Sequence, residues 1–198
     1  MDNDGVNEGR RRVLGAATAV VGGAGAVGVV IPFIGSWNPS ARAKAAGAPV
    51  TVDISKIEPG AMVTYEWRGK PVFVLRRTEE ALATLPELVE QLKDPNSEKS
   101  KQPGYVDATK RAIKDEYLVL LGLCTHLGCS PKLRADVGAA DLGGKDWLGG
   151  FFCPCHGSKF DLAGRVYSGA PATYNLEVPP YRYVGDKVIV IGEDQETV

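Results

Sequence analysis

Histidine and cysteine are scarce in this sequence, and the few that occur are not spread along it. Two histidines and four cysteines are present in 198 residues, and all six lie within residues 124–129 and 153–156. Random placement would scatter so few residues along the chain. The clustering therefore indicates one shared site.

A net charge of either sign is also lacking. The chain has 23 Lys and Arg against 24 Asp and Glu, which leaves −1 at pH 7. Nucleic-acid binding needs a basic excess, so we expect no nucleic-acid partner. The 24 glycines and 13 prolines favour a turn-rich, mainly β fold over a helical bundle.

Charged residues are absent from residues 13–35, directly after Arg10, Arg11 and Arg12. At about 1.5 Å per helical residue this stretch spans roughly 34 Å, enough to cross a bilayer. We therefore expect a cytoplasmic N-terminus over residues 1–12 and a single transmembrane helix over residues 13–35. An arginine pair before such a segment is typical of a twin-arginine export signal, a route taken by domains that fold with their cofactor before export.

Two outcomes are open for this apolar segment on the residues alone. It can remain as an anchor, or be removed near one of the small-x-small sites at residues 41–43 and 46–48. The positive-inside rule decides little, because Arg42 and Lys44 follow the segment. Residues 36–49 are small and mostly polar, which predicts a linker that serves as a spacer or as a hinge.

Residues 50–198 predict one β-rich domain with a single helix-and-loop insertion. Thr78 is suited to cap a helix, and leucines at helical spacing continue to Leu92. A polar loop follows over residues 93–101. Residues 50–54 alternate like a strand, and residues 116–123 are an apolar strand that leads into the first Cys-rich segment. Two hairpins are expected, one from residues 62–67 and 72–76, and a closing one from residues 181–184 and 187–191 with its turn at Gly185 and Asp186.

Two segments carry the chemistry, CTHLGC at residues 124–129 and CPCHGS at residues 153–158. Each supplies one Cys and one His, and each contains a further Cys. A CxH motif paired with a CxxH motif predicts a metal centre with mixed ligands, held by Cys124, His126, Cys153 and His156.

Three other interpretations of the two segments explain less. A structural zinc site fits poorly, because zinc ligand pairs usually stand two to four residues apart and only one residue separates Cys124 from His126. Two disulfides would leave both histidines without a role. A thiol redox motif would need CxxC, whereas Cys153 and Cys155 enclose a single residue.

The ligand set predicts a two-iron, two-sulfur cluster of unusual charge. With two thiolates and two neutral imidazoles the oxidised cluster has no net charge, whereas four thiolates would make it doubly negative. An electron is therefore accepted more readily, and the reduction potential is high. Reduction adds one negative charge about 5 Å from each ligand imidazole. At an effective dielectric of about 20, this charge favours the protonated imidazole by roughly 3 kcal/mol. Such a centre can take an electron and a proton from a quinol hydroxyl, with His126 and His156 as the catalytic groups.

Both segments resemble those of the Rieske iron–sulfur subunit of the bacterial cytochrome bc1 complex. The resemblance extends to the twin-arginine signal, the Ala-rich hinge, the insertion at residues 78–101, EYLVLLG before the first loop and NLEVPPY at residues 175–181. It covers nearly the whole chain. It implies a Rieske-type antiparallel β domain with a cluster-binding subdomain, one [2Fe–2S] cluster and a retained membrane anchor.

The resemblance also implies a role for each site residue. Cys124 and Cys153 would bind the inner iron, while His126 and His156 would bind the outer iron and reach the surface. Cys129 and Cys155 would form a disulfide between the loops.

Further residues would surround the cluster. Leu127 would help the domain dock on cytochrome b, and Ser158 would donate a hydrogen bond to a cluster sulfide. Gly157, Phe160 and Pro171 would complete the surroundings.

This sequence departs from the family pattern in three places. Phe160 stands where high-potential members have a Tyr whose hydroxyl donates to a ligand sulfur, which predicts a lower potential here. Thr173 stands where many bacterial relatives have a second proline in the loop over residues 169–173. The 26 residues between His126 and Cys153 exceed the mitochondrial spacing, and residues 138–150 are expected to form an extra surface loop.

The expected protein is thus a single-pass subunit in the bacterial inner membrane, with its cluster domain on the periplasmic side. It would take one electron from quinol, expected to be ubiquinol, and pass it to cytochrome c1. It would act only with cytochrome b and cytochrome c1, in a homodimeric complex. The alternatives are the Rieske small subunit of an arsenite oxidase and a binding domain with structural zinc.

Overall fold

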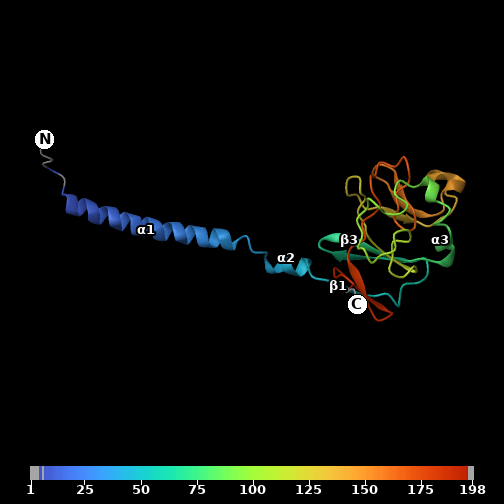
Figure 1. Cartoon of the computed structure of the whole chain (residues 1–198), viewed down its shortest axis with the longest axis horizontal. Helices are drawn as coiled ribbons and strands as arrows, with labels where there is room; N and C mark the ends of the chain where they lie inside the picture. Colours follow the sequence, from blue (N-terminus) through green and yellow to red (C-terminus); the bar gives the residue numbers. More distant parts are fainter. Residues whose placement is uncertain (1–4, 6, 196–198) are drawn as a thin grey trace. The chain divides into compact units, whose positions relative to one another are not determined.

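The computed structural model describes residue 5 and residues 7–195, in two compact units, residues 1–45 and 46–198. In the first unit, helix α1 (Glu8–Gly35) is long and apolar enough to cross a membrane, and none of its residues is buried (Figure 1). It begins before residue 13, because Asn7 caps it by accepting a hydrogen bond from the Arg10 amide. The arginines therefore lie on its first turns, and residues 13–35 are only its uncharged part.

A short helix interrupts the expected linker. Helix α2 (Ala41–Ala46) begins after Ser40, whose hydroxyl accepts a hydrogen bond from the Ala43 amide. Alanine and lysine are strong helix formers, so residues 36–49 are not wholly irregular.

Over its described residues, 46–195, the second unit contains three antiparallel sheets of three strands each. Their strand orders are β1-β9-β8, β2-β3-β4 and β5-β6-β7. The strands are β1 (Val50–Asp53), β2 (Met62–Trp67), β3 (Lys70–Arg76), β4 (Tyr117–Leu121), β5 (Lys132–Arg134), β6 (Gly150–Cys153), β7 (Ser158–Phe160), β8 (Tyr181–Val184) and β9 (Val188–Ile191).

The two hairpins predicted from the sequence are present, with adjusted ends. The β2–β3 turn consists of Arg68 and Gly69, which both have positive φ, so β3 begins at Lys70. Pro71 is tolerated there because a proline at the start of a strand removes little of the ladder. Strand β4 is buried along its whole length and leads into the first Cys/His loop.

The insertion at residues 78–92 differs from the predicted helix. Thr78 caps α3 (Glu79–Ala83) as expected, by accepting a hydrogen bond from the Ala81 amide, but the helix ends after five residues. Pro86 lacks an amide hydrogen and disfavours helical geometry in the residue before it. Turns then lead to a single 3₁₀ turn, η1 (Val89–Gln91).

The expected surface loop at residues 138–150 is instead partly built into the core. Its two 3₁₀ turns, η2 (Ala140–Leu142) and η3 (Gly144–Asp146), place Trp147 at 1% exposure. Trp147 belongs to a second apolar cluster, apart from the main core. The members of this cluster are Leu88, Leu92, Leu142, Trp147 and Tyr167. Residues 138–150 therefore hold residues 85–92 of the insertion against the part of the domain that carries the two Cys/His loops.

Candidate iron–sulfur site

The two Cys/His segments are loops at the ends of buried strands. The first follows β4 and leads towards β5, and the second is the connection between β6 and β7. Cys153 and Ser158 pair across that connection, so the second loop is held by its own hairpin.

Each loop closes on its first cysteine in the same way. The Gly128 amide donates to the Cys124 carbonyl at 2.9 Å, and the Gly157 amide donates to the Cys153 carbonyl at 2.9 Å. Both glycines have left-handed φ, 82° and 74°, which other residues adopt only with strain. In each loop, the glycine four residues after the first cysteine therefore turns the chain back.

A disulfide between Cys129 and Cys155 joins the two loops, as the resemblance implies. The Cys153 sulfur lies within 4.8 Å of both disulfide sulfurs. Those two sulfurs are bonded to each other, so this trio cannot serve as the ligand set of one ion. Within the described residues, no other group of this kind gathers around a single point.

The remaining cysteines, Cys124 and Cys153, are free and buried. Burial raises the pKa of the Cys153 thiol, and the neighbouring Cys124 sulfur adds to the effect. Buried thiolates need a metal to hold their charge, so this pair is suited to bind iron with release of its protons.

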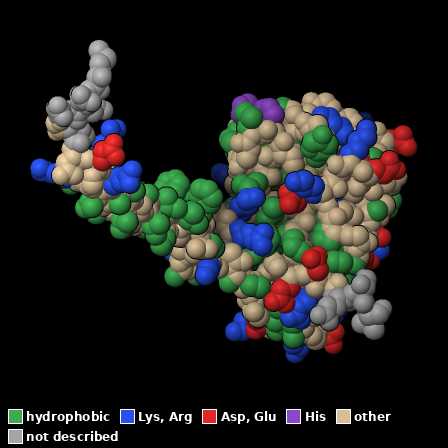
Figure 2. All heavy atoms as spheres, turned by 60° about the vertical axis from the view of Figure 1, so that its left-hand side comes forward, with side chains coloured by type: hydrophobic (Ala, Val, Ile, Leu, Met, Phe, Trp, Pro, Cys, Tyr) green, Lys and Arg blue, Asp and Glu red, His purple; other side chains and the backbone are tan. Residues whose placement is uncertain are grey.

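The two histidines lie together at the surface. Their ring centroids are 4.7 Å apart with the planes at 90°, and they form one purple patch in Figure 2. The His156 residue is exposed and His126 is half-buried. The Nδ1 atom of His126 is buried without a hydrogen-bond partner among residues 7–195. A buried, unpartnered nitrogen fits a metal ligand.

Ser158 is fully buried, and its hydroxyl oxygen accepts a hydrogen bond from the Ala172 amide at 3.0 Å. Its own hydrogen donates to no acceptor among residues 7–195. Phe160, two residues further on β7, is also fully buried. Leu127 is 71% exposed beside the histidines, and Pro171 is exposed on the neighbouring loop.

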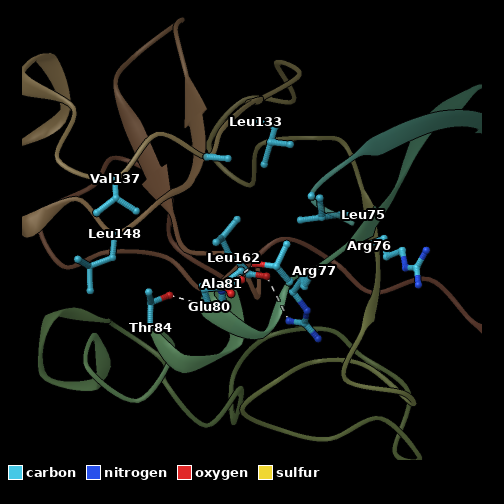
Figure 3. A pocket seen from close by; sticks show the side chains of 13 residues that line it. Leu75, Arg76, Arg77, Glu80, Ala81, Thr84, Leu133, Val137, Leu148 and Leu162 are labelled. Carbon is cyan, nitrogen blue, oxygen red and sulfur yellow. Dashed lines mark hydrogen bonds between the residues drawn. The ribbon is translucent and has the colours of Figure 1, made fainter. Parts of the chain in front are cut away.

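An apolar cavity of about 190 Å³ lies away from these loops. Figure 3 shows it between α3 and the segment that carries Leu133, Val137 and Leu148. None of the Cys or His side chains lines it, so it plays no part in the candidate site.

The fold and the paired loops define a class: small β proteins that hold an iron–sulfur cluster between two cross-linked loops. The family description "Rieske [2Fe-2S] domain" matches residues 48–181, and "Ubiquitinol-cytochrome C reductase Fe-S subunit TAT signal" matches residues 1–40. The chain therefore belongs to the Rieske [2Fe–2S] family, among the iron–sulfur subunits of ubiquinol–cytochrome c reductase.

Curated relatives agree with this assignment over nearly the whole chain. The ubiquinol–cytochrome c reductase iron–sulfur subunit of Allochromatium vinosum is 56% identical, over 98% of this chain and 94% of that protein. The corresponding subunit of Blastochloris viridis is 43% identical over 92% of each chain. A solved hyperthermophilic respiratory Complex III aligns with 88% of this chain and 98% of its own at 23% identity, with a TM-score of 0.47.

Some contacts around the site have no sequence signal. Lys93 donates hydrogen bonds to the Ala170 and Ala172 carbonyls beside the Ser158 hydroxyl. Backbone acceptors carry no side-chain identity, so no motif predicts such a contact. The matched glycines at residues 128 and 157 are different, because their common offset from each cysteine is visible in the sequence.

Proposed function

We propose that this chain is the electron-accepting iron–sulfur subunit of a quinol–cytochrome c oxidoreductase. The observation that carries the proposal is a pair of adjacent histidines, 4.7 Å apart, at the surface above the linked loops that bury two free thiols. Relatives with 56% and 43% identity are named as iron–sulfur subunits of ubiquinol–cytochrome c reductase, which favours this function over that of an arsenite oxidase subunit.

Four residues would hold the cluster. Cys124 and Cys153 would bind the inner iron as thiolates, and His126 and His156 the outer iron. The cluster supplies a one-electron acceptor of high potential. Since Nδ1 of His126 is the buried ring nitrogen, its Nε2 would be the atom that meets a quinol hydroxyl. It would accept the quinol proton in the state in which the ligand histidine, made more acidic by the oxidised cluster, has already lost its own Nε2 hydrogen.

The residues around the cluster would control how quinol reaches it and how the domain docks on cytochrome b. Leu127, exposed beside the histidines, offers an apolar contact for cytochrome b. The disulfide between Cys129 and Cys155 holds both loops at a fixed separation. Ser158 would donate its hydroxyl hydrogen to a sulfide, while Gly157 and Pro171 lie on the loops around the cluster.

The rest of the chain would place this domain. We assign residues 1–12 to the cytoplasm and residues 13–35 to a retained anchor in the bacterial plasma membrane. The hinge over residues 36–49 would allow the Rieske domain, residues 50–198, to move on the periplasmic side between quinol, expected to be ubiquinol, and cytochrome c1. The complex would be a homodimer that includes cytochrome b.

Purification of the tagged full-length chain from its membranes tests this proposal. We expect two irons and two acid-labile sulfides per chain, copurifying haem b and haem c, and quinol-dependent reduction of cytochrome c. A His156→Ala substitution should abolish that activity, while Lys145→Ala in the exposed η3 turn should not. One zinc per chain would contradict the cluster, and a molybdopterin partner would contradict the assigned complex.

A further inference from the structure

We propose that Lys93 is a positioning residue for the cluster, acting through the loop over residues 169–173 and the Ser158 hydroxyl. The inference rests on the proposed function, because it concerns the surroundings of the bound cluster. Lys93 lies outside both Cys/His loops, 31 residues before the first of them, and its role appears only in the contacts of its side chain.

The ammonium group of Lys93 bridges two carbonyls of this loop. Its Nζ donates to the Ala170 oxygen at 2.6 Å and to the Ala172 oxygen at 2.8 Å. Hydrogen bonds from a charged donor are stronger than neutral ones. One side chain therefore restrains two peptide groups of a segment that has no regular secondary structure.

The peptide group between these two carries the contact with Ser158. The Ala172 amide belongs to the peptide that follows Pro171, and it donates to the Ser158 Oγ at 3.0 Å. Ala172 and Ser158 are both fully buried. Because the peptides on either side are held by Lys93, the orientation of this amide is fixed as well.

The Ala172 amide in turn directs the serine hydroxyl. One lone pair of Oγ is engaged by the amide, which limits where the hydroxyl hydrogen can point. Thr173 adds no rigidity here, since its φ is free where a proline would fix it. Lys93 supplies the restraint from outside the loop.

The backbone of Lys93 is also anchored to the same region. Its amide donates to the Val166 carbonyl at 3.0 Å, and the Ser168 amide donates to the Gln91 carbonyl at 2.7 Å. A bridge between Leu92 and Tyr167 lies between these bonds. The lysine is therefore held both at its backbone and at its ammonium group.

The test compares two lysine substitutions in the intact complex. Lys93→Met removes the ammonium and keeps most of the aliphatic stem. Lys99→Met is the matched control: Lys99 is exposed, it lines a groove together with Thr125 of the first loop, and its ammonium has no hydrogen bond within residues 7–195. Both lysines are exposed, and both variants lose one positive charge.

We expect Lys93→Met to lower the midpoint potential of the cluster more than Lys99→Met does, in redox titrations followed by electron paramagnetic resonance. Lys93→Arg, which keeps donors for both carbonyls, should return the potential towards the wild-type value. In a Ser158→Ala background the two lysine substitutions should have equal effects, because the hydroxyl through which Lys93 acts is gone. If Lys93→Met and Lys99→Met lower the midpoint potential equally while Ser158 is present, the proposal is overturned.

Hydrogen exchange on the same complexes gives a second readout. The amides of Gly169, Ala170, Ala172 and Thr173 should exchange faster in Lys93→Met than in Lys99→Met. Unchanged exchange would also overturn the proposal, whatever the iron content of the variant. The iron, sulfide and quinol-reduction measurements on the wild type report on the proposed function separately. A wild-type complex that passes them while Lys93→Met behaves like Lys99→Met would refute only the role of Lys93.

Discussion

Cys129 and Cys155 join the two candidate ligand loops through a disulfide, although they lie 26 positions apart in the sequence. Closing a loop of this length is worth roughly 3.5 kcal/mol in the chain-entropy model. We expect the double variant Cys129→Ser, Cys155→Ser to lose its cluster at a lower denaturant concentration and to hold less iron. Circular dichroism of the cluster in the visible region would follow the loss. Equal denaturation midpoints and iron contents for wild type and variant would contradict a stabilising role for the disulfide.

Phe160 offers a test of how the potential is tuned. Its ring is fully buried on β7, two residues after Ser158. A hydroxyl added there could donate to a ligand sulfur and stabilise the more negative reduced cluster. Phe160→Tyr should therefore raise the midpoint potential. Phe152→Tyr, half-buried on the neighbouring strand β6, is the control and should leave it unchanged. An unchanged or lower potential in Phe160→Tyr would refute the explanation.

The sequence predicts the chemistry of the site better than it predicts the strands that hold the site in place. The ligand types are visible because only Cys and His can form such a centre, and the β8–β9 hairpin is visible from its alternation and its turn at Gly185. Strands β5, β6 and β7 are about as short as β8 and β9, but no tight turn joins them: residues 135–149 separate β5 from β6, and the second Cys/His loop separates β6 from β7. Their pairing depends on contacts made elsewhere in the fold.

Two errors in the predicted fold share one physical cause. The leucines up to Leu92 follow helical spacing, yet Leu88 and Leu92 are buried against Trp147, a partner more than fifty residues away. Helical spacing alone does not distinguish a helix from a sequence of turns that buries the same residues. The same cause explains why the sequence predicts an exposed loop at residues 138–150. The residues that cover Trp147 are distant in the sequence, so nothing near it indicates that it is buried.

The buried ion pair between Asp161 and Arg165 predicts a large loss of stability when it is broken. The Asp161 Oδ2 accepts from the Arg165 Nε at 2.7 Å, and both residues are at most 1% exposed. Arg165 also donates to the Leu85 carbonyl, which ties the insertion to the part of the domain that carries the two Cys/His loops. Asp161→Asn leaves the guanidinium without its counter-charge and should cost about 3–5 kcal/mol in the free energy of unfolding.

The matched control for this pair is Asp141→Asn, which breaks an ion pair between Arg134 and an exposed carboxylate. Exposed pairs contribute about 0–1 kcal/mol, so its effect should be small. Guanidinium unfolding of the two variants, followed by tryptophan fluorescence, provides the comparison. Similar losses in both would show that burial of the Asp161–Arg165 pair does not matter.

Asp94 gives the domain an acid-sensitive contact. Burial disfavours its charged form, but hydrogen bonds from the Ser100 hydroxyl and from the Lys99 and Glu98 amides outweigh this and lower its pKa. The pKa in the folded state is then below the unfolded value of about 3.9. The carboxylate therefore contributes its full stability above that unfolded value, and the contribution is lost as the pH falls through the folded-state pKa.

Asp94→Asn should accordingly be less stable than the wild type at neutral pH, and the difference should shrink as the pH falls below about 4. An asparagine retains one acceptor oxygen but presents an NH₂ group where the second oxygen accepted hydrogen bonds. Unfolding midpoints measured from pH 7 down to about pH 3 would show the convergence. Asp146→Asn, at an exposed carboxylate with no hydrogen bond within residues 7–195, is the control for the loss of one surface charge, and at neutral pH it should cost much less stability than Asp94→Asn. An offset between Asp94→Asn and the wild type that stays constant over this pH range would mean that the titration of Asp94 contributes nothing to acid unfolding.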